Sequence, residues 1–123
     1  MDLCSLTLGR PRLQVFGTAP DHEETAQLPS HGFARASKWD FLSRSSDGDS
    51  STSLRLDFGL TSTSLDDKTR AAWPFAFDLV YSVTLERTSL TTSLIVNNKE
   101  ESRPIEVQAL FHSYFRVNVS FVV

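Results

Sequence analysis

The stretch Phe75-Ala-Phe-Asp-Leu-Val-Tyr-Ser-Val-Thr-Leu85 decides the fold of this chain of 123 residues. Every second position along it carries an apolar or aromatic side chain, and these positions are Phe75, Phe77, Leu79, Tyr81, Val83 and Leu85. Because successive side chains of a strand point to opposite faces, a period of two places all of them on one face. The stretch therefore predicts a β-strand with that face turned towards a core.

Other stretches of the sequence predict further strands. Residues 90–96 follow across a short polar turn and are predicted to return antiparallel to the first strand. Residues 105–117 alternate in the same way and predict a third strand of this meander. Earlier in the chain, residues 39–42 and 54–60 predict two more strands.

Each predicted strand has one apolar face, so the sheet has to pack against another apolar surface. A second sheet is the natural partner, and the fold class we predict is all-β, an antiparallel β-sandwich. A sandwich of this kind usually has about seven strands. The sequence offers fewer, so we expect the sandwich to be incomplete and to form a single partial domain over residues 1–123.

Two local signals interrupt the strands. Residues 64–73 predict a short helix, with Ser64 as its N-cap, Asp67 in the position of a capping-box acid and Pro74 as its end. Gly32, between His31 and an aromatic residue, predicts a tight backbone conformation. We expect both tryptophans, Trp39 and Trp73, to pack in the core.

Composition limits the classes of function. The formal net charge is −3, so we expect no general attraction to nucleic acid or to an anionic membrane. No apolar run is long enough to span a bilayer. The one cysteine, Cys4, cannot form an internal disulfide, which fits a reducing compartment, and we expect a cytoplasmic protein.

His112 is the residue of the sequence most suited to proton transfer. The predicted strand at residues 105–117 places it on the polar face with Tyr114 and Arg116. An imidazole can give or take a proton near neutral pH, which suits a general acid or base. The alternative is an ordinary exposed sheet face, which is polar in any protein.

Three motifs occur in the order and spacing of one family. They resemble the glucose-6-phosphate 1-epimerases, also called hexose-6-phosphate mutarotases, of the aldose 1-epimerase superfamily. The resemblance covers roughly residues 15–117. It rests on His31-Gly-Phe-Ala-Arg35 with a following Trp39, on Trp73-Pro-Phe75 with the alternating Phe77-Asp-Leu-Val-Tyr81, and on Phe111-His-Ser-Tyr-Phe-Arg116.

The resemblance implies a β-sandwich of the galactose mutarotase-like type that binds a hexose 6-phosphate in a groove on one sheet. It implies interconversion of the α and β anomers by acid/base ring opening, with no metal or organic cofactor. It assigns His112 as the general acid towards the ring oxygen, and Arg35 and His31 to substrate binding. The other interpretation of Arg35 and His31 is a loop pinned by its own hydrogen bonds.

The sequence departs from the family pattern at three points that bear on activity. The arginine with which the family helps hold the phosphate has no clear counterpart, since neither Arg10 nor Arg12 aligns with it. Ser30 stands where the family commonly has Gln before the motif His. The catalytic Glu of the family comes late in its sequence, and no Glu of this chain is assigned to that role. We therefore expect a truncated member of the family that lacks the catalytic Glu, and the sequence leaves open whether this chain is active as an isomerase. The alternative is a non-catalytic carbohydrate-binding β-sandwich fragment.

Overall fold

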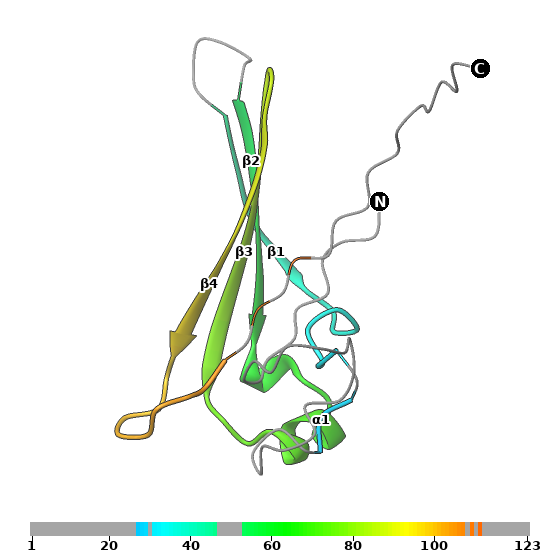
Figure 1. Cartoon of the computed structure of the whole chain (residues 1–123), viewed down its shortest axis with the longest axis vertical. Coiled ribbons are helices and arrows are strands. Elements are labelled where there is room, and N and C mark those ends of the chain that lie inside the picture. Colours follow the sequence, from blue (N-terminus) through cyan, green and yellow to red (C-terminus); the bar gives the residue numbers. More distant parts are fainter. Residues whose placement is uncertain (1–26, 30, 47–52, 108, 110, 112–123) are drawn as a thin grey trace, which may run out of the picture.

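The computed structural model describes residues 27–29, 31–46, 53–107, 109 and 111. These residues form one twisted antiparallel sheet with the strand order β1-β2-β3-β4 (Figure 1). A 3-10 helix and the short helix α1 connect β2 to β3. The elements are β1 (Asp40–Ser46), β2 (Ser53–Thr61), the 3-10 helix (Ser62–Ser64), α1 (Asp67–Ala72), β3 (Phe77–Glu86) and β4 (Leu90–Asn98).

Strand β3 lies in the middle of the sheet and fixes its register. It pairs with β2 from Asp78 opposite Thr61 to Glu86 opposite Ser53, without a shift. Its other edge pairs with β4 over nearly the whole length of both strands. Directly opposed residues share a face, so the apolar positions of the three strands line up on one side of the sheet.

The outer strand β1 contains the irregularity of the sheet. Its register with β2 shifts between Phe41 and Ser43, which leaves Leu42 as the extra residue of a bulge. The side chain of Leu42 then lies over Gly59, where an added Cβ would meet it at 3.0 Å. The glycine thus makes room for the bulge.

The core covers one end of the apolar face of the sheet. Phe77 and Leu79 from β3 and Leu60 from β2 are each 1% exposed. Helix α1 and the segment of residues 27–39 cover these side chains, and both lie at the same end of the sheet in Figure 1. The buried cluster comprises Leu28, Phe33, Ala34, Leu60, Leu65, Trp73, Phe75, Phe77 and Leu79.

The other end of the apolar face is open in the part of the chain that the structure describes. Leu85 and Leu90, which pair across β3 and β4, are each 53% exposed, and Phe41 is 60% exposed. The described residues contain a single sheet. The predicted all-β antiparallel fold is confirmed, in an incomplete form.

The prediction of strands is confirmed for four of the five stretches. The strands predicted at residues 39–42, 54–60, 75–85 and 90–96 correspond to β1, β2, β3 and β4. The strand predicted at residues 105–117 is wrong over residues 105–107, which form no strand. Residues 108, 110 and 112–117 of that prediction lie outside the described residues.

The turn after β4 explains why residues 105–107 do not add a strand beside it. Arg103 Nη2 donates to Pro74 O at 2.8 Å, and Glu100 Oε1 accepts from Ala76 N at 2.6 Å. Asn98 Nδ2 also donates to Arg103 O at 2.9 Å. These bonds tie the turn to the residues that precede β3. The chain then crosses the sheet, as the orange trace in Figure 1 shows.

The predicted helix is present, but its N-cap is a different residue. Asp66 caps α1, since its carboxylate accepts from Thr69 N and Thr69 Oγ1, each at 2.8 Å. Ser64 belongs to the preceding 3-10 turn and donates instead to Thr61 O at 2.8 Å. The prediction that Trp73 packs in the core is confirmed by its 1% exposure. No helix in the part of the chain that the structure describes has the length and apolar character needed to span a membrane.

The opposite face of the sheet carries a polar network across three strands. Asp57 accepts from Ser82 Oγ at 2.5 Å, from Arg55 Nε at 2.8 Å and from Ser43 Oγ at 2.7 Å. Ser82 is only 3% exposed, so the carboxylate satisfies a buried hydroxyl. These bonds, that from Ser82 above all, lower the pKa of Asp57 to about 2.

This pKa predicts how the stability of the sheet depends on pH. Because the folded pKa lies below the ordinary value of 3.8, the contribution of Asp57 is complete above about pH 4 and is lost as the pH falls towards 2. In thermal unfolding followed by circular dichroism, wild type should lose stability across this window more steeply than Asp57→Asn. Asp40→Asn, which alters an exposed carboxylate of β1, is the matched control and should follow wild type. Equal slopes for wild type and Asp57→Asn would contradict the prediction.

Candidate functional site

The segment that carries His31 and Arg35 is a loop anchored by its own backbone. Phe33 O accepts from Ala36 N at 3.0 Å, from Ser37 N at 3.1 Å and from Ser37 Oγ at 3.0 Å. Before this turn, Gly32 N donates to Pro29 O at 2.9 Å. Phe33 is 3% exposed, so the turn is also held by its burial in the core.

Two consecutive residues of the loop adopt the left-handed conformation. The φ angles are 67° at His31 and 70° at Gly32. Glycine adopts this region freely, whereas a residue with a Cβ pays about 1 kcal/mol or more for it. The prediction of a tight backbone at Gly32 is confirmed, and it extends to His31. Residues held in such conformations cluster at functional sites.

Trp39 ties the loop to the sheet. Its indole Nε1 donates to Ala34 O at 2.8 Å, across the turn that contains Arg35. Its ring meets Tyr81 of β3 edge-on, with centroids 6.2 Å apart. Tyr81 in turn contacts Phe111, with ring centroids 6.3 Å apart. The loop is therefore linked through Tyr81 to the residue that precedes His112.

The structure places two of the three predicted site residues on this loop. Arg35 is exposed and forms no hydrogen bond or ion pair within the described part of the chain. His31 is half-buried. The loop is held by hydrogen bonds, as the alternative interpretation expected. Backbone groups, the Ser37 hydroxyl and the Trp39 indole take part in these bonds, and the Arg35 guanidinium does not. His112 lies outside the described residues.

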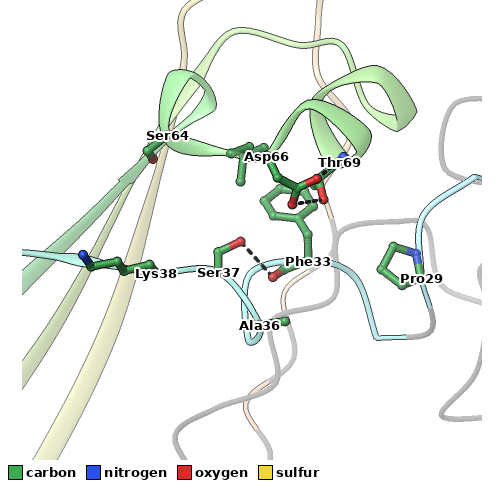
Figure 2. Close-up of a pocket in the computed structure, with 9 residues that line it drawn as sticks. Pro29, Phe33, Ala36, Ser37, Lys38, Ser64, Asp66 and Thr69 are labelled. Carbon is green, nitrogen blue, oxygen red and sulfur yellow. Dashed lines mark hydrogen bonds between the residues drawn. The ribbon is translucent and has the colours of Figure 1, made fainter.

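A pocket of about 260 Å³ lies on another side of the same loop, between it and the start of α1 (Figure 2). Its polar groups are largely engaged with each other, as the dashed bonds in Figure 2 show for Ser37 and Asp66. The bonds from Thr69 lower the pKa of Asp66. Neither His31 nor Arg35 is among the lining residues, which are Pro29, Phe33, Ala36, Ser37, Lys38, Ser64, Leu65, Asp66 and Thr69.

The loop with His31 and Arg35 and the stretch around His112 both fall within a match to a known protein family. A family model described as aldose 1-epimerase matches residues 11–120 of the chain. The chain belongs to the aldose 1-epimerase family. The match spans the loop with His31 and Arg35 as well as His112. Membership supports an isomerase that acts on a sugar as a mutarotase or epimerase. The superfamily predicted from the three motifs is thereby confirmed.

Two of the four glutamates among the described residues, Glu86 and Glu100, are held in local contacts. Glu100 accepts from Ala76 N and pairs with Arg103 at 3.2 Å, and its bond to the Ala76 amide lowers its pKa. Glu86 accepts from Ser89 Oγ at 2.5 Å in the turn between β3 and β4. Within the described residues, no group of three His, Cys, Asp or Glu residues could hold a metal ion.

Sequence reasoning missed the second role of Trp39 and the role of Tyr81. The sequence predicts core packing alone for Trp39, and Trp39 does pack, partly buried, against the buried cluster. Its bond to Ala34 O, however, also fixes the turn around Arg35. The signal available in the sequence was its place four residues after Arg35, since a loop of that length can fold back on itself. Nothing in the sequence paired Trp39 with Tyr81.

Replacing Trp39 by Phe should loosen the loop of residues 31–37, because it removes the indole N–H donor and keeps an aromatic ring at this position. Loss of the indole donor leaves Ala34 O without its partner, at a cost of about 1 kcal/mol. Local opening should therefore increase about fivefold. We expect trypsin to cleave after Arg35 faster by that factor, as measured by mass spectrometry of timed digests. Cleavage after Arg87, in the turn between β3 and β4, is the internal control and should not change. Unchanged cleavage after Arg35 would show that the indole bond does not hold the loop.

Proposed function

We propose that this epimerase acts on hexose 6-phosphates, interconverting their α and β anomers. The observation that carries the proposal is the exposed Arg35 on a loop whose shape is held by other groups. A guanidinium offers paired donors that match a phosphate. Because the loop is already fixed by Trp39 and the Phe33 turn, little ordering would be needed when the phosphate binds.

The proposed chemistry is ring opening and closure by proton transfer. A base removes the proton of the anomeric hydroxyl, the bond between the anomeric carbon and the ring oxygen breaks, and an acid protonates that oxygen. The aldehyde then rotates, and closure on its other face reverses both proton transfers. We assign His112 as the acid, because an imidazole can donate a proton near neutral pH. His31 is assigned as a second substrate contact.

Sugar binding without catalysis is the second candidate function. The observation that favours it is the engagement of Glu86 and Glu100 in local hydrogen bonds, which makes them unsuited to act as the base. In that case Arg35 and His31 would still hold a hexose 6-phosphate. Binding and turnover therefore have to be measured separately.

Arg35→Ala should remove the preference for the phosphorylated sugar. Loss of a charge-assisted contact should weaken binding of glucose 6-phosphate about tenfold or more, while the affinity for glucose stays the same. Isothermal titration calorimetry with both sugars measures the two affinities. Arg44→Ala, which removes an exposed guanidinium from β1, is the control and should bind as wild type does. An unchanged preference in Arg35→Ala would remove Arg35 from the phosphate site.

His112→Ala should abolish the catalysis of anomerisation. Removing a general acid typically costs about 10²–10⁴-fold in rate. The rate is measured by polarimetry on freshly dissolved α-glucose 6-phosphate, and the circular dichroism of the sheet should be unchanged. Equal turnover in wild type and variant would exclude His112 as the acid. Saturable binding without rate enhancement in wild type would favour the binding function.

A further inference from the structure

Strand β4 forms one outer edge of the sheet, and no residue in the described part of the chain pairs with that edge (Figure 1). An edge strand presents a row of backbone N–H and C=O groups that can pair with another strand. Residues 105–107 do not cover this row, because Glu100 and Arg103 bond to the residues before β3 and direct the chain away from β4. The edge of β4 therefore has room for a partner strand.

The two edges of the sheet differ in how well they could pair with another strand. Strand β1, at the other edge, carries the charged residues Asp40 and Arg44 and is interrupted by the bulge at Leu42. Charges and bulges on an edge oppose pairing with a further strand. Strand β4 has the sequence LTTSLIVNN, with no charge and no proline, and its register with β3 runs without a shift from Leu90 to Asn98. Only β4 has the character of a pairing edge.

We propose that β4 pairs antiparallel with β4 of a second copy of this chain, around a twofold axis at Leu94. Pairing centred there uses all nine residues of the strand, with Leu90 opposite Asn98 of the second copy. Directly opposed residues share a face, so Leu94 meets its own copy and Thr92 meets Val96 on the apolar face. A register shifted by one residue would set the apolar face of one copy beside the polar face of the other.

The charges next to β4 support this register. Arg87 precedes Leu94 by seven residues and Glu101 follows it by seven, so the twofold brings Arg87 of each copy towards Glu101 of the other. Both side chains are exposed, and neither forms a hydrogen bond or ion pair within the described residues. Lys99 and Glu100, by contrast, are paired within their own chain. The two charges that remain available are thus the two that the proposed register brings together.

Pairing through β4 would also end at two copies. A twofold contact uses the same strand of both chains and leaves no second β4 edge for a third copy. The outer edges of the resulting sheet are the β1 strands, whose charges and bulge oppose further pairing. We therefore expect a closed dimer and not an open fibre. This assembly is independent of the proposed activity on hexose 6-phosphates.

Exchanging the two charges tests the partner and the register together. Analytical ultracentrifugation of the full chain, without sugar, should show a dimer for wild type. Arg87→Glu and Glu101→Arg should each weaken dimerisation about three- to thirtyfold, because each sets like charges together at two symmetric positions. The double variant Arg87→Glu/Glu101→Arg should restore the wild-type affinity. Arg44→Glu, which makes the same charge change on β1, is the matched control and should dimerise as wild type does.

A lysine in the middle of β4 tests the edge itself. Ile95 is 48% exposed and lies outside the buried cluster, so Ile95→Lys should keep the far-ultraviolet circular dichroism of wild type. It should abolish the dimer, because it places a charge from each copy close to the twofold axis. A wild-type chain that stays monomeric up to its highest soluble concentration would overturn the proposal. So would assemblies larger than a dimer, a dimer unaffected by Ile95→Lys, an equal loss in Arg44→Glu, or a double charge exchange that fails to restore the dimer.

Discussion

Burial of one end of β3 under Phe33 and Trp73 is the contact on which the rest of the described structure depends. Phe77 lies in the middle of it, with ring centroids 5.7 Å from Phe33 and 5.2 Å from Trp73. Truncating a buried ring of this size typically costs 3–5 kcal/mol, a large part of the stability of a small domain. Two segments distant in sequence meet here, the loop around Phe33 and the stretch from Trp73 to Phe77, and their contact determines where the loop with His31 and Arg35 lies relative to the sheet.

Backbone geometry, more than side-chain charge, fixes the conformation of the loop that carries the proposed site. The burial of Phe33 holds the turn against the core. His31 and Gly32 enter the turn in the left-handed conformation, and the Trp39 indole donates to Ala34 O across it. A guanidinium on such a support keeps its donors for a ligand, since the loop does not need them. A preformed binding loop requires that the groups which hold its shape differ from the groups which contact the ligand.

A second set of contacts guides the chain from β4 across the sheet. The guanidinium of Arg103 bonds to Pro74 O and lies 4.0 Å over the ring of Phe75. Glu100 holds Ala76 N from the same turn. The turn thereby takes its position from the residues just before β3, and the chain that follows reaches Tyr81 through Phe111. A strand beside β4 would have carried Phe111 away from Tyr81.

The sequence by itself determined four strands, the all-β antiparallel class, the aldose 1-epimerase family and the tight backbone at Gly32. These rest on short-range patterns, since alternation with a period of two, polar turns and a motif are all local to the chain. Tertiary structure alone decided the cap of α1, the course of residues 105–107 and the link from Trp39 through Tyr81 to Phe111. Each depends on a partner far along the chain or on competition between nearby groups. Residues 105–107 have the alternation of a strand, yet Glu100 and Arg103 bond to residues before β3. Local periodicity cannot predict these bonds, because their partners lie more than twenty residues earlier in the chain.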